Sequence, residues 1–175
     1  DDRCPLAMTT FEPDEAARRA VAEAFDVDDN RTFDQDPEYG ISALAEIVIK
    51  ALSPSLNDPV TAVRVIDRLV RVLTTWGNAS AGEEPNFDRV YVPPLDTGEL
   101  YRVAFSELAL FGANDVRVGA ALQRGLCSLA QLPDPDSAAA AREQAARALA
   151  LAEDALVVEQ DYARLRAINE TFRAR

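Results

Sequence analysis

The sequence contains no histidine. Histidine titrates near neutral pH, acts as the base in Ser–His and Cys–His nucleophile pairs, and is a common zinc ligand. Its absence excludes those nucleophile pairs, zinc sites built on histidine, and proton transfer by histidine near neutral pH. This is the sharpest exclusion that the composition allows.

Cysteine and lysine are also scarce. Cys4 lies near one terminus and Cys127 lies within a helical pattern, so their spacing indicates neither a metal knuckle nor a disulfide framework. We expect Cys127 to be a small core residue. Lys50 is the single lysine beside 17 arginines. Because this bias is typical of GC-rich coding, the arginine count by itself indicates little about function.

Long apolar runs are missing as well. No stretch approaches the ~20 apolar residues that span a bilayer, and the first residues lack the charged and apolar regions of a signal peptide. The chain begins at Asp1 rather than with methionine. We therefore expect it to be a fragment of a longer protein, from which targeting or membrane segments have been removed.

Acidic residues dominate the charge: 30 Asp and Glu stand against 18 Lys and Arg, giving a formal net charge of -12. Such a field repels the phosphates of nucleic acids and anionic lipid surfaces. Nucleic acid is therefore excluded as a partner of the domain as a whole. A solvated acidic surface that maintains solubility is the simplest interpretation.

A chain of 175 residues, 48% of them hydrophobic, predicts a single domain over residues 1–175 with a core in 31–132. Apolar residues recur at helical spacing, which favours a mainly α, single-domain helical bundle of about six helices. Two short runs predict a small two-stranded β patch, at residues 6–11 and 89–92. Helices are expected at about 13–25, 36–52, 58–76, 96–111 and 116–132, with an Ala-rich helical hairpin or long helix at 137–174.

Two helices begin with the same pair of residues, Asp36-Pro37 and Asp58-Pro59. The aspartate caps free backbone N–H groups, and proline gives up an N–H that has no helical partner at that position. Between them, residues 41–52 are apolar on nearly every face. We therefore expect this helix to be the central, most buried one. Further along the chain, Phe111 is expected in the core.

The helix at 58–76 has a polar face formed by Arg64, Asp67, Arg68 and Arg71. A phosphate site could be built from such arginines, but we interpret them as a solvated helix face.

A polar cluster around the two Asp-Pro pairs is the candidate site. It consists of Arg31, Gln35, Asp36, Asn57, Asp58 and Thr61. One interpretation is a pocket for a small ligand or a cation; the other is helix caps with an arginine that ties down the loop. The caps of an antiparallel helix pair lie at opposite ends, which argues against paired acid and base carboxylates. No catalytic residue, metal ligand or cofactor site is predicted, because calcium-loop, phosphate-loop and GxSxG motifs are absent.

The stretch from Arg31 to Ala62, RTFDQDPEYGISALAEIVIKALSPSLNDPVTA, resembles a bacterial family of predicted membrane proteins, domain of unknown function 2254. A weaker match covers residues 89–93 and 105–115, and beyond Leu132 the match is only compositional. The motifs that carry the resemblance are Arg31-Thr32, Gln35-Asp36-Pro37, Gly40, Ala51-Leu52-Ser53-Pro54, Asn57-Asp58-Pro59 and Thr61-Ala62.

The resemblance implies a preceding region of about four transmembrane helices in the bacterial inner membrane. An even number of spans with the N-terminus inside would place this domain in the cytoplasm. The family supplies no established activity to carry over. Its signature residues are the six residues of the candidate site, with an unknown role.

These observations favour a non-catalytic cytoplasmic domain that binds a partner or an unknown small ligand, or that holds a homo-oligomer together. Its expected partners are its own transmembrane region and a second copy of itself. Two alternatives stay open: a carboxylate-based, metal-dependent hydrolase, and a regulatory domain of a channel or transporter.

Overall fold

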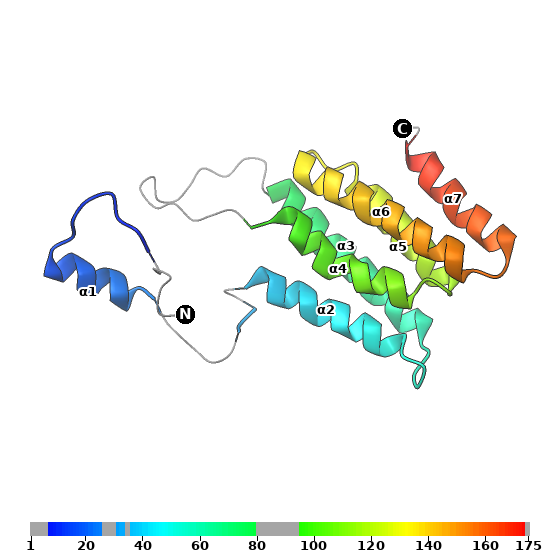
Figure 1. Ribbon diagram of the computed structural model, residues 1–175, viewed down its shortest axis with the longest axis horizontal. Helices are drawn as coiled ribbons and strands as arrows, with labels where there is room; N and C mark the ends of the chain where they lie inside the picture. Colours follow the sequence, from blue (N-terminus) through cyan, green and yellow to red (C-terminus); the bar gives the residue numbers. More distant parts are fainter. Residues whose placement is uncertain (1–6, 26–30, 34–35, 80–94, 174–175) are drawn as a thin grey trace. The chain divides into compact units, whose positions relative to one another are not determined.

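The computed structural model describes residues 7–25, 31–33, 36–79 and 95–173, which contain seven α-helices and no strand (Figure 1). This confirms the predicted mainly α helical fold. Residues 7–11 have no regular secondary structure, and residues 89–92, the second predicted strand, lie outside the described residues. The chain forms two compact units, residues 1–32 and 33–175.

The first unit contains α1 (Glu15–Glu23), which Asp14 caps. Its apolar residues, among them Val21 and Phe25, remain exposed. The second unit contains the other six helices, which are α2 (Pro37–Ala51), α3 (Pro59–Ala79), α4 (Thr97–Phe111), α5 (Val116–Leu129), α6 (Pro135–Ala155) and α7 (Glu159–Arg173).

Aspartate begins most of the helices in the second unit. The carboxylates of Asp36, Asp96, Asp115 and Asp134 each accept a backbone N–H from the first turn of α2, α4, α5 and α6. These bonds satisfy donors that a helix leaves unpaired at its N-terminus. The helix starts expected at about residues 36, 96 and 116 are thereby confirmed. The Ala-rich segment breaks after Ala155 into two helices.

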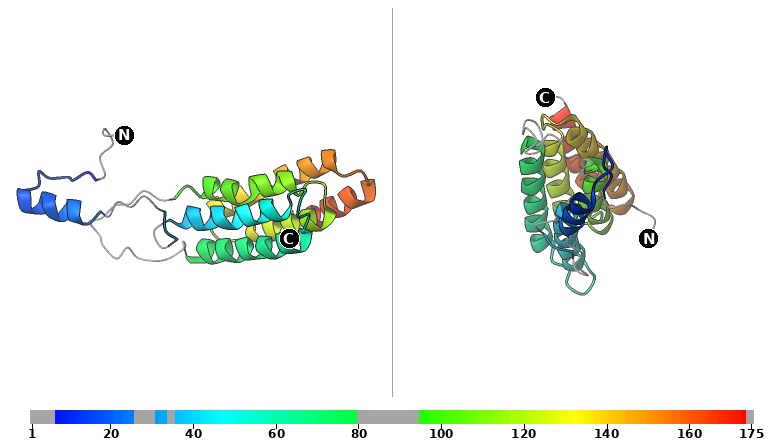
Figure 2. Two further views of the ribbon diagram at one scale, coloured as in Figure 1. Left: turned by 90° about the horizontal axis from the view of Figure 1, so that it is seen from below. Right: turned by 90° about the vertical axis from the view of Figure 1, so that its left-hand side faces the viewer.

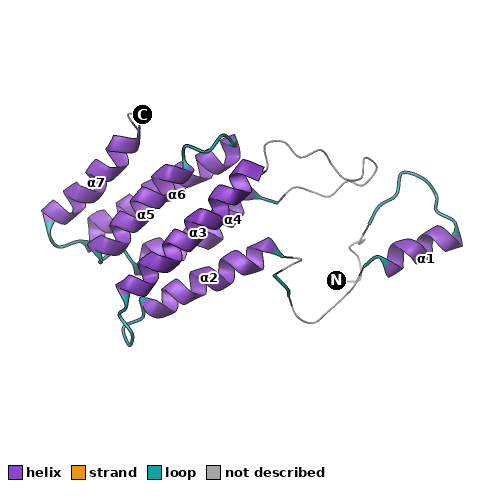
Figure 3. Cartoon of the chain, turned by 180° about the vertical axis from the view of Figure 1, so that it is seen from behind, coloured by secondary structure: helices purple, strands orange, loops and turns teal. Residues whose placement is uncertain are grey.

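The six helices lie in two rows, α2, α4 and α6 in one row and α3, α5 and α7 in the other (Figure 1). Between the rows, α2 packs against α3, and α5 packs against α6. α4 packs against both α2 and α6, and α5 packs against both α3 and α7. Figure 1 shows α4 and α6 in front of α3 and α5, and Figure 3 shows the opposite side. Helices within a row run in the same direction (Figures 1 and 3). Side-chain hydrogen bonds connect them: Ser106 bonds Gln144 between α4 and α6, and Asn169 bonds Gln123 between α7 and α5.

The most enclosed helix is α5, with nine buried residues among its fourteen. Two glycines let its neighbours approach. A Cβ on Gly119 would lie 2.7 Å from Leu165 of α7, and one on Gly125 would lie 2.5 Å from Val70 of α3. Real Cβ atoms do not reach such distances, so both contacts depend on glycine. The middle of the array, rather than the segment at 41–52, is thus the centre of the fold.

The prediction that residues 41–52 form the most buried helix is wrong. Only four residues of α2 are buried, and Ile47 is 47% exposed. The physical reason is position: α2 lies at one end of the array and packs against only α3 and α4. Its extra apolar residues face outward instead of meeting another helix. Phe111, expected in the core, is also 47% exposed at the last turn of α4.

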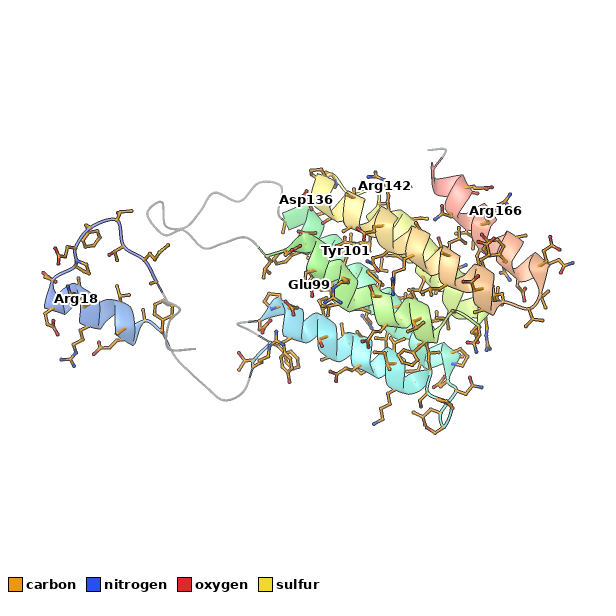
Figure 4. All side chains as sticks on the ribbon, in the orientation of Figure 1. Arg18, Glu99, Tyr101, Asp136, Arg142 and Arg166 are labelled. Carbon is orange, nitrogen blue, oxygen red and sulfur yellow. The ribbon has the colours of Figure 1, made fainter. Side chains whose placement is uncertain are left out.

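The core lies between the two rows and is built from large side chains. Tyr101 and Phe105 of α4 are fully buried, with ring centroids 6.0 Å apart in a tilted arrangement; Figure 4 labels Tyr101 on α4. Ile66, Leu69 and Leu73 of α3 belong to the same hydrophobic cluster. Burial of each such side chain contributes about 1.5–3 kcal/mol, so this cluster holds the two rows together.

Candidate functional site

The structure separates Asp36 from three of the other predicted site residues. Asn57, Asp58 and Thr61 lie together at the corner between α2 and α3, while Asp36 lies at the other end of α2. At 1.5 Å per residue, the 15 residues of α2 place these groups about 22 Å apart. Arg31 belongs to the first unit, and Gln35 lies outside the described residues. The binding role predicted for the set stays a prediction.

The corner after α2 is built by Asn57 and Asp58. Asn57 has a φ of 45°, in the left-handed region, and its N–H bonds the Ser53 carbonyl. Asparagine tolerates this conformation better than most residues. The Asp58 N–H then bonds the Ala51 carbonyl at 2.8 Å, which closes the turn at the end of α2. The corner is therefore a defined backbone structure.

Asp58 caps α3 through three hydrogen bonds. Its Oδ1 accepts the N–H groups of Val60 and Thr61 at 3.1 and 3.0 Å, and its Oδ2 accepts the Thr61 hydroxyl at 2.6 Å. These bonds stabilise the charged carboxylate, so the pKa of Asp58 lies below its ordinary value, chiefly through the Thr61 hydroxyl. Asp58 is thus already engaged as a cap.

At the opposite end, Asp36 caps α2 by accepting the Tyr39 N–H at 3.0 Å. The ring of Phe33 stacks on that of Tyr39, with centroids 5.0 Å apart. This contact places Phe33 against the first turn of the helix. Asp36 and Asp58 therefore have one chemical role at two separate places.

An apolar groove that the sequence did not locate opens beside Asp36. It has a volume of about 430 Å³ and lies where α2, the second half of α3 and the start of α4 meet. No charged side chain lines it. We call it the α2–α3 groove, and its residues include Phe33, Leu44, Ile47, Val72, Trp76 and Leu100. Figure 2 shows α2 and α3 running side by side along this edge of the second unit.

The side chains of the groove are accessible to a partner. Phe33 is 65% exposed and Val72 46% exposed, and Trp76 is half-buried. Contiguous exposed apolar surface is uncommon on soluble monomers and marks contact surfaces or ligand sites. One sequence signal pointed here: Ile47 falls off the buried stripe of its helix. The contribution from α3, whose register against α2 depends on the fold, had no such signal.

Two negative observations apply to the described residues. None of their helices is long and apolar enough to cross a membrane. No three Cys, Asp or Glu side chains among them gather where a metal ion could be held.

Comparisons with known proteins give the family. A model of the family described as "Predicted membrane protein (DUF2254)" matches residues 3–128. Three curated proteins, one from Mycobacterium bovis and two from strains of Mycobacterium tuberculosis, are each 28% identical over 139 residues. All three are named as uncharacterized. The match covers 76% of this chain and 27% of each relative, so the chain spans about a quarter of their length. No solved structure matches the chain.

Proposed function

The chain belongs to the DUF2254 family of predicted membrane proteins, and on that basis we propose that it is a non-catalytic domain of a bacterial membrane protein, one that holds two copies of the protein together. The observation that carries this proposal is the α2–α3 groove. It is an apolar surface at the end of the helical array, with no charged side chain in its lining.

A second copy of this chain is the occupant that the groove fits. A two-fold interface uses one patch twice, so that patch must carry both a hollow and side chains that project into the partner's hollow. Ile47 and Val72 belong to the lining of the hollow and are each about half exposed, so a second copy can contact them. Since the lining is apolar, pairing two such faces leaves no charged group buried without a partner.

The structure supplies no comparable support for the hydrolase alternative. A metal-dependent hydrolase needs carboxylates that converge on one ion. Asp36 and Asp58 instead cap separate helices at opposite ends of α2, and each carboxylate binds backbone N–H groups there. A regulatory role toward a channel or transporter is compatible with self-association, and it requires the membrane region for a test.

Light scattering coupled to size-exclusion chromatography tests the proposal. The mass of the chain should rise from monomer to dimer between micromolar and millimolar concentration. Ile47→Glu should keep the chain monomeric, because it places two carboxylates in the apolar interface. Leu110→Glu is the matched control: Leu110 is a 53% exposed apolar residue of α4 outside the groove, and its variant should dimerise as the parent does.

A chain that is monomeric at every concentration would overturn the proposal, and so would equal loss in both variants. Binding of a small apolar molecule by a strictly monomeric chain would assign the groove to a ligand instead. Salt adds a further check. Each copy carries a net charge of -12, so screening of the repulsion should strengthen dimerisation.

The cytoplasmic location is part of the same proposal and needs the intact protein. The family resemblance implies an even number of spans before this domain. Fusing fluorescent-protein and alkaline-phosphatase reporters after Arg175 in the full-length protein distinguishes the two sides of the inner membrane. Fluorescence without phosphatase activity is expected, and the reverse result would place the domain outside the cytoplasm.

A further inference from the structure

A second hollow lies in the row formed by α3, α5 and α7, away from the α2–α3 groove. Its volume is about 400 Å³. Because α3 and α5 run parallel, their first turns lie next to each other and form an apolar floor that includes Pro59, Val63 and Val116. Around that floor stand four arginines, Arg64 of α3, Arg117 and Arg124 of α5, and Arg164 of α7. We call this hollow the arginine pocket.

The charge of the arginine pocket is opposite to that of the chain. No acidic side chain lines it, although Asp and Glu outnumber Lys and Arg by 30 to 18 overall. Arg117 is held in place by Asp115, whose oxygens accept its Nε at 3.1 Å and its Nη2 at 2.6 Å. This pairing lowers the pKa of Asp115. The pocket therefore has one guanidinium that is already oriented.

The other three arginines form no ion pair or hydrogen bond with any residue that the structure describes. Like charges around one hollow repel one another, and an anion bound between them relieves that repulsion. The two nearest helix caps neutralise part of this charge, since Asp115 pairs with Arg117 and Asp58 attracts Arg64 electrostatically. Arg124 and Arg164 have no such carboxylate bonded to them among the residues that the structure describes. The guanidinium groups remain as the donors for a ligand.

We propose that the arginine pocket binds a phosphate ester with an apolar body. Guanidinium forks match the oxygens of phosphate and bond them in pairs, which is why arginine is common where phosphate is recognised. The apolar floor has no donor for a second polar group and would pack against hydrocarbon. The volume lies within the range of small-molecule sites. Such an ester could come from solution or as the headgroup of an anionic lipid, and the probes below separate these sources.

The arrangement could not be recognised along the sequence. Of the four charged residues on the polar face of α3, only Arg64 lines the pocket, and its partners come from α5 and α7. Arg68 and Arg71 are exposed on the same helix but outside the hollow. They therefore provide controls with the same charge change on the same chain.

Three probes test the proposal by calorimetry and sedimentation with the whole chain: inorganic phosphate, phenyl phosphate, and vesicles of phosphatidylcholine with or without phosphatidylglycerol. Phenyl phosphate should bind more tightly than inorganic phosphate, and raising the salt concentration should weaken both. The variant Arg124→Gln/Arg164→Gln should lose roughly tenfold or more in affinity. The control Arg68→Gln/Arg71→Gln should bind within about twofold of the parent.

Each outcome bears on the proposal. Binding of phenyl phosphate in solution supports a free ester, and binding only to vesicles that contain phosphatidylglycerol supports a lipid headgroup. Equal binding of phosphate and phenyl phosphate would overturn the role of the apolar floor. Absence of binding to all three probes, or equal loss in the pocket and control variants, would overturn the site. Circular dichroism of each variant checks that it folds. Substitution of an exposed arginine usually changes stability little, so the spectra of the variants should match that of the parent.

Discussion

The two ends of the helical array differ in the polarity of the side chains that they expose to solvent. At the α6–α7 end, α7 buries Leu165 and Asn169 and turns charged residues outward, among them Arg166 and Glu170, which form an ion pair at 3.0 Å; Figure 4 labels Arg166 on this helix. At the α2–α3 end, α2 turns Ile47 outward beside an apolar groove.

Stacked helical units are soluble when their terminal helices carry a polar outer face. By that criterion the α6–α7 end is a suitable terminal surface, because its outer face is polar apart from the exposed Val157 and Val158 in the turn before α7. The outer face of the α2–α3 end is apolar, as is usual for a helix that another helix covers, but no described helix of the second unit lies against it. The comparison teaches that hydrophobic content alone does not tell which helix is central: α2 is rich in apolar residues although it lies at an end of the array.

The largest effect on stability is expected at the α6–α7 end, where α7 is anchored to α5. Leu165→Ala removes a fully buried side chain that fills the space above Gly119. We expect a loss of about 2–5 kcal/mol in the free energy of unfolding, measured by urea denaturation. Leu110→Ala, the same change at an exposed position of α4, should cost about 0.5 kcal/mol or less. Similar losses for the two variants would mean that α7 is not anchored through Leu165.

A smaller loss is expected from the buried polar link between α5 and α7. Asn169 Nδ2 donates to Gln123 Oε1 at 2.8 Å, and Gln123 Nε2 donates to the Ala145 carbonyl at 2.9 Å. Asn169→Leu leaves the Gln123 oxygen buried without a donor, which should cost about 1–3 kcal/mol in unfolding free energy.

The double variant Gln123→Leu/Asn169→Leu separates the hydrogen bond from packing. With both polar groups gone, no buried oxygen is left unpaired, so the pair should be less destabilised than the sum of the single variants. Additive losses would show that the two side chains act independently.

The sequence was sufficient for the helices and insufficient for their order in space. Asp36, Asp96 and Asp115 identify helix starts because capping is a local interaction, read within three residues. The position of α2 at an end is not local. It depends on which helices become neighbours in the folded chain. The apolar run at 41–52 is equally consistent with a central helix and with a helix that has two contact faces.

The candidate sites show the same difference between local and non-local information. Asn57, Asp58 and Thr61 are neighbours in the sequence and lie together in the structure. The arginine pocket joins residues 64, 117, 124 and 164, which no spacing rule connects. Two contacts between neighbouring helices of one row, α3 with α5 and α5 with α7, create it. Sites formed across a helix row need the tertiary arrangement before they can be recognised.

A still smaller stability effect is expected in the groove. Ile47→Ser removes an apolar side chain that is already half exposed, so the free energy of unfolding of the monomer should change by about 1 kcal/mol or less. Urea denaturation at low protein concentration measures this value. At high concentration the parent should gain stability through dimerisation and the variant should not. A large loss in the dilute monomer would mean that Ile47 belongs to the core.

The smallest difference concerns acid sensitivity at the α2–α3 end. Thr61→Val keeps the shape of the side chain but removes the hydroxyl that donates to Asp58 Oδ2. Because that bond is the main cause of the lowered pKa of Asp58, the variant should raise this pKa toward its ordinary value. The pH dependence of the Asp58 side-chain carboxyl carbon chemical shift in NMR measures it. An unchanged pKa would assign the shift to the backbone N–H groups instead.

The direction of the pH effect on stability follows from the lowered pKa. A carboxyl group whose pKa is lower in the folded than in the unfolded chain stabilises the fold fully above its unfolded pKa and loses that contribution as the pH falls through the folded value. For Asp58 the unfolded value is near 3.8. The parent should therefore lose the contribution of this cap below about pH 4, and Thr61→Val should lose less over the same range because it has less to lose. Asp96 of α4 accepts the Glu99 N–H without such a hydroxyl, so its chemical shift in the same spectra should be unaffected by the substitution.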